Sequence, residues 1–287
     1  MTQALDIRLA VDGGGSGCRA VLVDGTGRRL GLGAGPAANV TTDFDAALAA
    51  VNAAVAEAGR AAGLDAAQVR DAPAWVGLAG AIDAETCARV AAALPQRRAT
   101  VTDDRPTAMA GALGGADGCL VAAGTGSFLG RQAGGQRRFV GGWGLVLADQ
   151  ASGVWLGRRL LAALVDWQDG LGPGAPVLTA VLDRFGSAAA VSRFSIKASP
   201  ADFAALAPRV TAAAGDAVAR GLMQEGADWI VRGLAALGRR AGEPVCLTGG
   251  IGPHYAAWLP QDMTAALVAP QGTPLDGAVR LALGLRR

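Results

Sequence analysis

Two glycine-rich turns, each bordered by short apolar runs, constrain the fold of this chain more than any other feature. The first, DGGGSG at residues 12–17, separates the apolar runs 7–11 and 18–23. The second, AGTGS at residues 123–127, follows the apolar run CLVAA. Short apolar runs bounded by glycine are typical of buried strands, so each turn is predicted to close a β-hairpin. A pattern that occurs twice predicts two similar halves.

The residues after the first turn predict a complete α/β unit. The turn DGTG at residues 24–27 leads to a third strand near 30–34, which gives an antiparallel meander. A helix is expected next, with Thr42 as its N-cap and one apolar face made by Phe44, Leu48, Val51 and Val55. Strands at 75–78 and 99–102 and helices at 85–94 and from about Pro106 complete this half.

The second half repeats the order. After the second turn we expect two further strands, a helix in SGVWLGRRLLAALVDWQDG and a loop at 170–176. Residues 201–240 are predicted to be mostly helical, EPVCLTGGIG a strand that enters a glycine turn, and residues 275–285 a closing helix. The predicted domains are residues 1–113, completed by the C-terminal helix 273–287, and residues 114–272.

Composition excludes several classes of protein. The chain has 287 residues, of which 51% are hydrophobic and 17% charged, so a folded globule is expected. A net charge of +2 without a long basic run does not indicate nucleic-acid binding. The four cysteines form no CxxC or Cys/His cluster, which argues against a structural zinc or iron–sulfur site within the chain.

The residue inventory also limits how phosphate could be bound. His254 is the only histidine and Lys197 the only lysine, and no Walker A motif surrounds that lysine. A Rossmann loop fails because Cys18 stands at the third glycine position. We expect His254 to be a loop or helix-start residue without a catalytic role. If the chain handles phosphate, it must do so with backbone amides and a divalent cation.

The N-terminus lacks a basic stretch followed by an apolar core, and no apolar run reaches membrane-spanning length. We therefore expect a cytoplasmic protein with no membrane and no nucleic-acid partner. The sequence leaves the oligomeric state open, with a homodimer as one form.

Several segments together resemble the actin/Hsp70/sugar-kinase group, and within it the BadF/BadG/BcrA/BcrD-type ATPase family. DGGGSGCR resembles the first phosphate loop, AGTGSFLG the second and CLTGGIGP the nucleotide loop. GPAANV, VTDDRPTAMAGAL and GGWGLVLADQASGVWLG resemble sugar-contacting and base-holding segments of the family's N-acetylglucosamine and glucosamine kinases. The resemblance implies two ribonuclease H-like (actin-like ATPase) halves that face a central nucleotide and sugar cleft.

The resemblance also implies roles for individual residues. Asp12 would face Mg²⁺, and Asp104 would be the base that takes the proton of the sugar 6-hydroxyl. ATP would be bound by residues of three glycine turns: Gly13, Gly14, Gly15, Ser16 and Gly17; Thr125 and Gly126; Gly249 and Gly250. The sugar would be bound by Asn39, Asp104, Gly142, Asp149 and Gln150.

Some of these residues have simpler interpretations. Asp12 could belong to an ordinary hairpin, Asp104 or Asp103 could cap the following helix, and Asn39 could be a loop residue. Gly249 and Gly250 could form a plain strand-to-helix turn. Trp143 and Trp155 are expected to pack in the core or hairpin rather than to stack on a ligand.

The resemblance implies an ATP- and Mg²⁺-dependent kinase that phosphorylates the 6-hydroxyl of a small amino sugar. Gln150 and Phe128 depart from residues common in acetylglucosamine kinases, which favours D-glucosamine. N-Acetylglucosamine kinase remains the first alternative. A dehydratase-activating ATPase is disfavoured by the scattered cysteines, and a non-catalytic sugar sensor by the presence of both Asp12 and Asp104.

Overall fold

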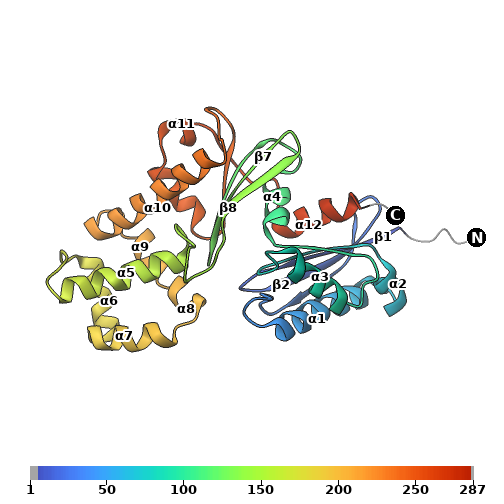
Figure 1. Cartoon of the computed structure of the whole chain (residues 1–287), viewed down its shortest axis with the longest axis horizontal. Helices are drawn as coiled ribbons and strands as arrows, with labels where there is room; N and C mark the ends of the chain where they lie inside the picture. Colours follow the sequence, from blue (N-terminus) through green and yellow to red (C-terminus); the bar gives the residue numbers. More distant parts are fainter. Residues whose placement is uncertain (1–5, 286–287) are drawn as a thin grey trace, which may run out of the picture. The chain divides into compact units, whose positions relative to one another are not determined.

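The computed structural model describes residues 6–285. The chain divides into two compact units, one made of the residues up to 116 together with those from 270 onward, the other of residues 117–269. Each unit holds one five-stranded sheet with helices (Figure 1). The predicted limits at 113/114 and 272/273 lie near the ends of these units, and the domain division itself stays a prediction.

The sheet of the first unit has the order β3-β2-β1-β4-β5. Its strands are β1 (Ile7–Gly13), β2 (Cys18–Asp24), β3 (Arg29–Gly35), β4 (Ala74–Leu78) and β5 (Ala99–Thr102). The first three form the predicted antiparallel meander, whereas β4 and β5 run parallel to β1. The carboxyl ends of β1, β4 and β5 therefore meet at one edge of the sheet.

Helix α1 (Phe44–Ala62) packs closely on β3, because alternate residues of that strand are glycine. A Cβ at Gly33 would lie 2.0 Å from the carbonyl oxygen of Ala54 in α1, so no side chain fits there. The predicted N-cap, Thr42, is wrong. Asp43 caps the helix, since its carboxylate accepts the N–H of Ala46 at 2.9 Å. Thr42 instead donates its N–H to Asn39 in the preceding turn.

Four more helices complete the first unit. They are α2 (Ala66–Asp71), which the sequence did not predict, α3 (Ala84–Ala93), α4 (Arg105–Leu113) and the C-terminal α12 (Pro274–Leu283). Helix α12 covers the face of β1 and β2 opposite α1. There its buried apolar residues pack against those of the strands: Ala10, Val21, Val23, Leu275, Ala278 and Ala282.

The second unit repeats this sheet. Its strands are β6 (Gly118–Ala123), β7 (Ser127–Ala133), β8 (Gln136–Gly141), β9 (Val245–Thr248) and the short β10 (Leu267–Val268), in the order β10-β9-β6-β7-β8. Strands β6, β7 and β8 form an antiparallel meander, and β9 and β10 run parallel to β6. Strand order and direction match the first unit element by element, which confirms the predicted α/β fold.

The helices of the second unit fill most of residues 153–264. They are α5 (Gly153–Gln168), α6 (Pro176–Phe185), α7 (Ala188–Lys197), α8 (Pro200–Ala204), α9 (Ala207–Thr211), α10 (Ala217–Ala236), the 3₁₀ helix η1 (Gly252–Trp258) and α11 (Gln261–Thr264). The predicted loop ends at Pro176, which begins α6. Helices α6 and α7 were not predicted. His254 lies in η1, near a helix start as expected.

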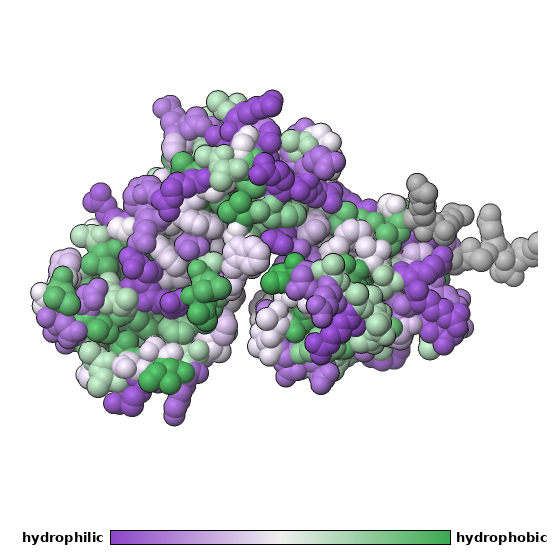
Figure 2. All heavy atoms as spheres, in the orientation of Figure 1, coloured by the Kyte–Doolittle hydropathy of each residue, from purple (hydrophilic) through white to green (hydrophobic). Residues whose placement is uncertain are grey.

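Among the described residues, no helix combines the length and the apolar character needed to cross a membrane. Figure 2 shows apolar side chains scattered among polar ones on the visible face. Trp155 is buried in the core of the second unit, as expected, but Trp143 is 62% exposed. The prediction that Trp143 packs in the core or hairpin is therefore wrong, because the loop that carries it turns its side chain to solvent.

Candidate functional site

The first predicted phosphate loop is the tip of the β1–β2 hairpin. Gly13 pairs with Cys18 across the hairpin, and the turn is closed by the N–H of Gly14 on the carbonyl of Gly17 at 2.9 Å. Gly13 is buried, and a Cβ there would lie 2.5 Å from Leu78, so packing explains it. At Gly15 a Cβ would meet nothing within 4 Å. The open side of the turn at Gly15 and Ser16, both exposed, is thus free for a ligand to approach.

Asp12 lies directly before this turn, opposite Arg19 in the β1–β2 register. The Arg19 Nη2 is 3.5 Å from Asp12 Oδ2, and the Arg19 side chain is half exposed. Burial raises the pKa of the Asp12 carboxyl, and the charge of Arg19 offsets part of this rise. A half-buried carboxylate with one exposed counter-charge suits a divalent cation that keeps much of its own water.

The two aspartates after β5 have different surroundings. Asp103 accepts the backbone N–H of Arg105 at 2.9 Å and also holds its guanidinium through Nε at 2.7 Å. Asp104 occupies the N-cap position of α4, yet its carboxylate makes no capping hydrogen bond. The capping interpretation therefore applies to Asp103, as the sequence allowed, and leaves the Asp104 carboxylate available for chemistry.

The electrostatics of Asp104 suit a proton acceptor. Burial is the largest cause, and the neighbouring charges of Asp103 and Asp12 add to it, so that the pKa of Asp104 rises from 3.8 to about 7. A carboxylate with a pKa near neutral pH can accept a proton and still be charged in a large fraction of molecules. Its backbone carbonyl is fixed by the Thr107 hydroxyl at 2.6 Å and by the N–H of Ala108.

Asn39 lies at the same edge of the sheet, because it bridges Ala79 directly after β4. Its side-chain oxygen accepts the N–H of Thr41 at 3.0 Å and organises the turn. The loop is tied to the first phosphate turn by the N–H of Ala38 on the carbonyl of Gly14 at 2.9 Å. The first unit thus brings together Asp12, the glycine turn, Asn39 and Asp104.

The second predicted phosphate loop connects β6 and β7. The N–H of Gly124 closes the turn on the carbonyl of Gly126 at 2.9 Å. The start of α5 holds the turn from behind, since Gly153 donates to the carbonyl of Gly124 and Val154 to that of Thr125, at 2.8 and 3.1 Å. Thr125 is therefore presented by a turn that the helix fixes at two points.

Asp149, Gln150 and Gly142 lie in the segment between β8 and α5. Asp149 is only 8% exposed and has a left-handed backbone with φ of 62°. Burial raises the pKa of its carboxyl, while the N–H groups of Ser127 and Gly144 favour the charged form. Gln150 accepts the Ser127 hydroxyl through its carbonyl at 2.5 Å. Asp149 and Gln150 therefore lie against the second phosphate turn, and Gly142 begins the same segment.

The third predicted loop follows β9. A Cβ at Gly249 would lie 2.3 Å from the carbonyl oxygen of Ala123, and its φ is 82°, so both space and conformation require glycine. A Cβ at Gly250 would meet nothing within 4 Å. Gly249 thus seats this turn against the second phosphate turn, and Gly250 presents an open backbone. The second unit brings together Thr125, Gly126, Asp149, Gln150 and Gly249.

Sequence reasoning missed two features of this site. Asp12 and Arg19 are the first and last residues of DGGGSGCR, and the β1–β2 register places them directly opposite each other. The ion pair between Asp103 and Arg105 depends on a side-chain conformation, for which the sequence carries no signal.

Within the described residues, no group of three or more His, Cys, Asp or Glu side chains forms a metal cluster.

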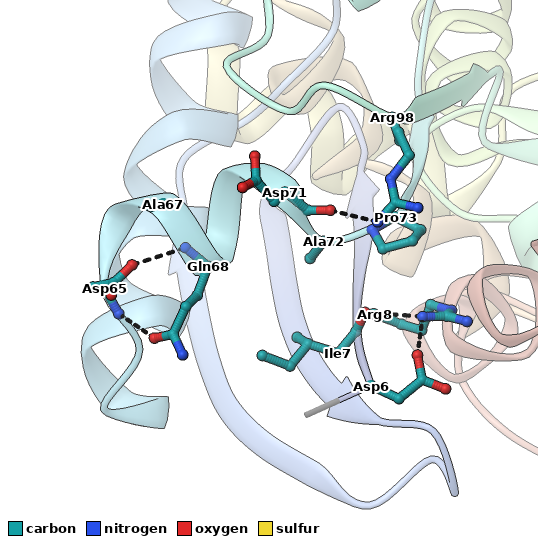
Figure 3. A pocket seen from close by; sticks show the side chains of 10 residues that line it. All are labelled: Asp6, Ile7, Arg8, Asp65, Ala67, Gln68, Asp71, Ala72, Pro73 and Arg98. Carbon is teal, nitrogen blue, oxygen red and sulfur yellow. Dashed lines mark hydrogen bonds and ion pairs between the residues drawn. The ribbon is translucent and has the colours of Figure 1, made fainter. Parts of the chain in front are cut away.

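A cavity of about 500 Å³ lies at the other edge of the first sheet (Figure 3). It is lined by residues at the starts of β1, β4 and β5 and by α2, and Arg98 donates there to the carbonyl of Asp71 at 2.8 Å. None of the predicted site residues lines it. The candidate site at the carboxyl ends of the strands and this cavity are therefore separate features.

Comparisons with known proteins agree with this picture. A model of the BadF/BadG/BcrA/BcrD ATPase family matches residues 9–274. Glucosamine kinase of Vibrio cholerae is 31% identical over 278 residues, covering 96% of this chain and 95% of that protein.

Solved structures are also similar. A protein of Chromobacterium violaceum, provisionally named an N-acetylglucosamine kinase, is 34% identical with a TM-score of 0.88, covering 98% of this chain and all of that one. A ROK family glucokinase from Streptomyces griseus, solved with glucose and AMPPNP, has 22% identity and a TM-score of 0.57 and covers 97% of this chain and 100% of that chain. At that identity the last match bears on the fold alone.

Proposed function

The chain belongs to the BadF/BadG/BcrA/BcrD ATPase family, and on that premise we propose that it is an ATP-dependent kinase that converts D-glucosamine to glucosamine 6-phosphate. The observation that carries this proposal is the Asp104 carboxylate. This carboxylate is half-buried and makes no capping hydrogen bond. Its pKa is raised to about 7, in part by the charge of Asp12 beside the first glycine turn. The relative from Vibrio cholerae supports glucosamine as the substrate.

Asp104 is proposed to accept the proton of the sugar 6-hydroxyl while that oxygen attacks the γ-phosphorus of ATP. The bond between the γ-phosphorus and the bridging oxygen to the β-phosphate breaks, and ADP leaves with that electron pair. Asp103 cannot fill this role equally well, because Arg105 occupies both of its oxygens. The pairing thus supports a capping role for Asp103 and proton transfer by Asp104.

Backbone amides are proposed to bind the phosphates. Gly14, Gly15, Ser16 and Gly17 would contact the β- and γ-phosphates, with Gly13 packing beneath them, whereas Thr125 and Gly126 would contact the γ-phosphate. Gly249 and Gly250 would lie on the adenosine or α-phosphate side. Asp12 would hold Mg²⁺ through water, and the ion would neutralise phosphate charge, because the proposed phosphate-binding turns contain no lysine.

Asn39, Gly142, Asp149 and Gln150 are the proposed sugar contacts. The Asn39 oxygen is engaged by Thr41, which leaves its NH₂ group as the donor toward a hydroxyl. N-Acetylglucosamine kinase is the second candidate, favoured by the 34% identity to the similarly named protein of Chromobacterium violaceum.

ADP release should be measured with glucosamine, N-acetylglucosamine and glucose at equal concentrations, and each product mapped for the position of its phosphate. The proposal expects the highest kcat/KM with glucosamine and phosphate on the 6-oxygen. Preference for N-acetylglucosamine would favour the second candidate. ADP release that no sugar stimulates would contradict both, and an iron-containing preparation would point to a dehydratase-activating ATPase.

A further inference from the structure

The segment between β8 and α5 is unusual in its backbone. Asp149 and Ala151 are the two non-glycine residues in the described part of the chain with positive φ, at 62° and 66°. Such conformations cost free energy in residues that carry a Cβ, and they persist where surrounding contacts enforce them. The contacts of Asp149 should therefore identify the neighbouring elements that keep the segment in this conformation.

The Asp149 carboxylate packs directly on the second phosphate turn. A Cβ on Gly126 would lie 3.2 Å from Asp149 Oδ2, so the carboxylate covers that face of the glycine. The backbone N–H of Ser127 is a hydrogen-bond partner of the same carboxylate. The Ser127 hydroxyl donates to the carbonyl of the next residue, Gln150, at 2.5 Å. Ser127 of the turn therefore binds two consecutive residues of the segment, Asp149 through its backbone N–H and Gln150 through its hydroxyl.

The same carboxylate also reaches the glycine loop that follows β8. The N–H of Gly144 is its second backbone partner. Gly144 in turn accepts the N–H of Ala148 at 2.9 Å, which closes the loop into a turn. Gly142 and Gly144 both have positive φ, so this loop has little intrinsic preference for one conformation. A contact from outside the loop is what fixes it.

We propose that Asp149 is a positioning residue that holds the Thr125–Gly126–Ser127 turn and the Gly142–Gly144 loop in one fixed arrangement. Because the first is the proposed γ-phosphate contact and the second a proposed sugar contact, loss of Asp149 disturbs both substrates rather than the sugar alone. This role rests on the proposed function only in naming the two substrates. The physical coupling of the two backbone segments does not depend on it.

The test compares Asp149→Asn with Asp117→Asn. Asp117 is an exposed aspartate of the same unit whose carboxylate accepts the N–H of Gly134 at 3.0 Å, so it is a matched backbone-binding control. An amide has one acceptor oxygen in place of two and carries no charge, so the hydrogen bonds from the N–H groups of Ser127 and Gly144 are expected to weaken. Residue-resolved amide hydrogen exchange by NMR follows Ser127, Gly144 and Gly134 in each variant.

Asp149→Asn is expected to speed exchange at Ser127 or Gly144 at least tenfold and to leave Gly134 unchanged, whereas Asp117→Asn leaves Ser127 and Gly144 unchanged. In steady-state kinetics, Asp149→Asn is expected to raise KM for both ATP and the amino sugar, and Asp117→Asn neither. Unchanged exchange at Ser127 and Gly144, or a rise in KM for the sugar alone, overturns the proposal.

If Asp149→Asn fails to fold, Asp149→Glu takes its place. It keeps the charge but moves the carboxylate by one methylene, so exchange at Ser127 and Gly144 should still be faster than in the wild type, and unchanged exchange again overturns the proposal. If the wild type phosphorylates no amino sugar, the proposed function fails, while the exchange data still decide whether Asp149 couples the two segments.

Discussion

Asp103 and Arg105 form a two-armed ion pair, with Nε to Oδ1 at 2.7 Å and Nη2 to Oδ2 at 3.1 Å. Both side chains are largely buried, at 17% exposure each. Both carboxylate oxygens of Asp103 bind the Arg105 guanidinium, and one of them also accepts the N–H of Arg105 at the start of α4. The carboxylate of the next residue, Asp104, makes no capping hydrogen bond. Two adjacent carboxylates therefore have different hydrogen-bonding surroundings.

The pKa of about 7 at Asp104 predicts the pH dependence of activity. A base must be deprotonated, so kcat/KM should rise as pH increases through about 7 and fall about tenfold per unit below it. Initial rates from pH 5 to 9 at low sugar concentration measure this. A profile that stays flat across neutral pH would contradict the assignment of Asp104 as the base.

Stability should depend on pH in the opposite sense. The folded pKa of Asp104 lies above its ordinary value of 3.8, so the folded state binds more protons than the unfolded state between about pH 4 and 7. The contribution of this group is therefore fully present below pH 4 and is lost as pH rises through 7. Thermal melts without nucleotide should show that Asp104→Asn gains stability relative to the wild type at pH 8 but not at pH 4.

Asp103→Asn tests the like-charge effect on Asp104. Removing the Asp103 charge removes one cause of the raised pKa, so the acidic limb of the rate profile should move to lower pH. Asp83→Asn is the control, because Asp83 caps α3 through the N–H of Thr86 at 2.7 Å and is not among the charges that shift Asp104. A limb that moves equally in both variants would mean that helix capping, not charge, sets the profile.

Asp12→Asn should raise the Mg²⁺ concentration needed for half-maximal activity and the KM for Mg-ATP, with a smaller effect on the KM for the sugar. An amide keeps the size of the side chain but removes the charge that a divalent cation requires. Asp24→Asn is the control on the next strand, where Asp24 holds the 24–27 turn through Thr26 and Arg28. If both variants show the same Mg²⁺ requirement, Asp12 does not hold the metal.

Gly249→Ala and Gly250→Ala form a matched pair. The first places a Cβ 2.3 Å from the Ala123 carbonyl at a φ of 82° and should destabilise the protein by about 1–3 kcal/mol. In Gly250→Ala the added Cβ meets no protein atom within 4 Å, so the stability of the protein should be nearly unchanged. The KM for ATP should rise, because the Cβ would occupy the space through which ATP approaches that backbone. Chemical denaturation and steady-state kinetics separate the two effects. An unaffected KM in Gly250→Ala would remove that residue from the nucleotide site.

Much of the fold could be predicted, because glycine turns and short apolar runs carry strong local signals. The meander of β1 to β3, the turns at residues 12–17 and 123–127 and the repetition of the whole pattern follow from them. The cap of α1 was misassigned because Thr42 and Asp43 are both good caps. Only the turn made by Asn39, which takes the N–H of Thr42, selects between them.

Weak local signals and long-range contacts limited the rest of the prediction. Helix α2 has only six residues, too few for a periodic signal, and its capping box at Asp65 and Gln68 is its one local mark. Trp143 was expected to be packed, as most tryptophans are largely buried, but positive φ at Gly142 and Gly144 turns the loop outward. The left-handed backbone of Asp149 depends on contacts with Ser127 and Gly144, which no local pattern encodes.

The most direct test of the central claim is ³¹P NMR of the reaction of ATP with glucosamine, run with the wild type and with Asp104→Asn. The account predicts one glucosamine 6-phosphate for each ADP with the wild type, and a rate at least about 100-fold lower in a variant that melts as a folded protein and still binds ATP. Wild-type turnover in Asp104→Asn, or ADP formed without a sugar phosphate, would contradict it.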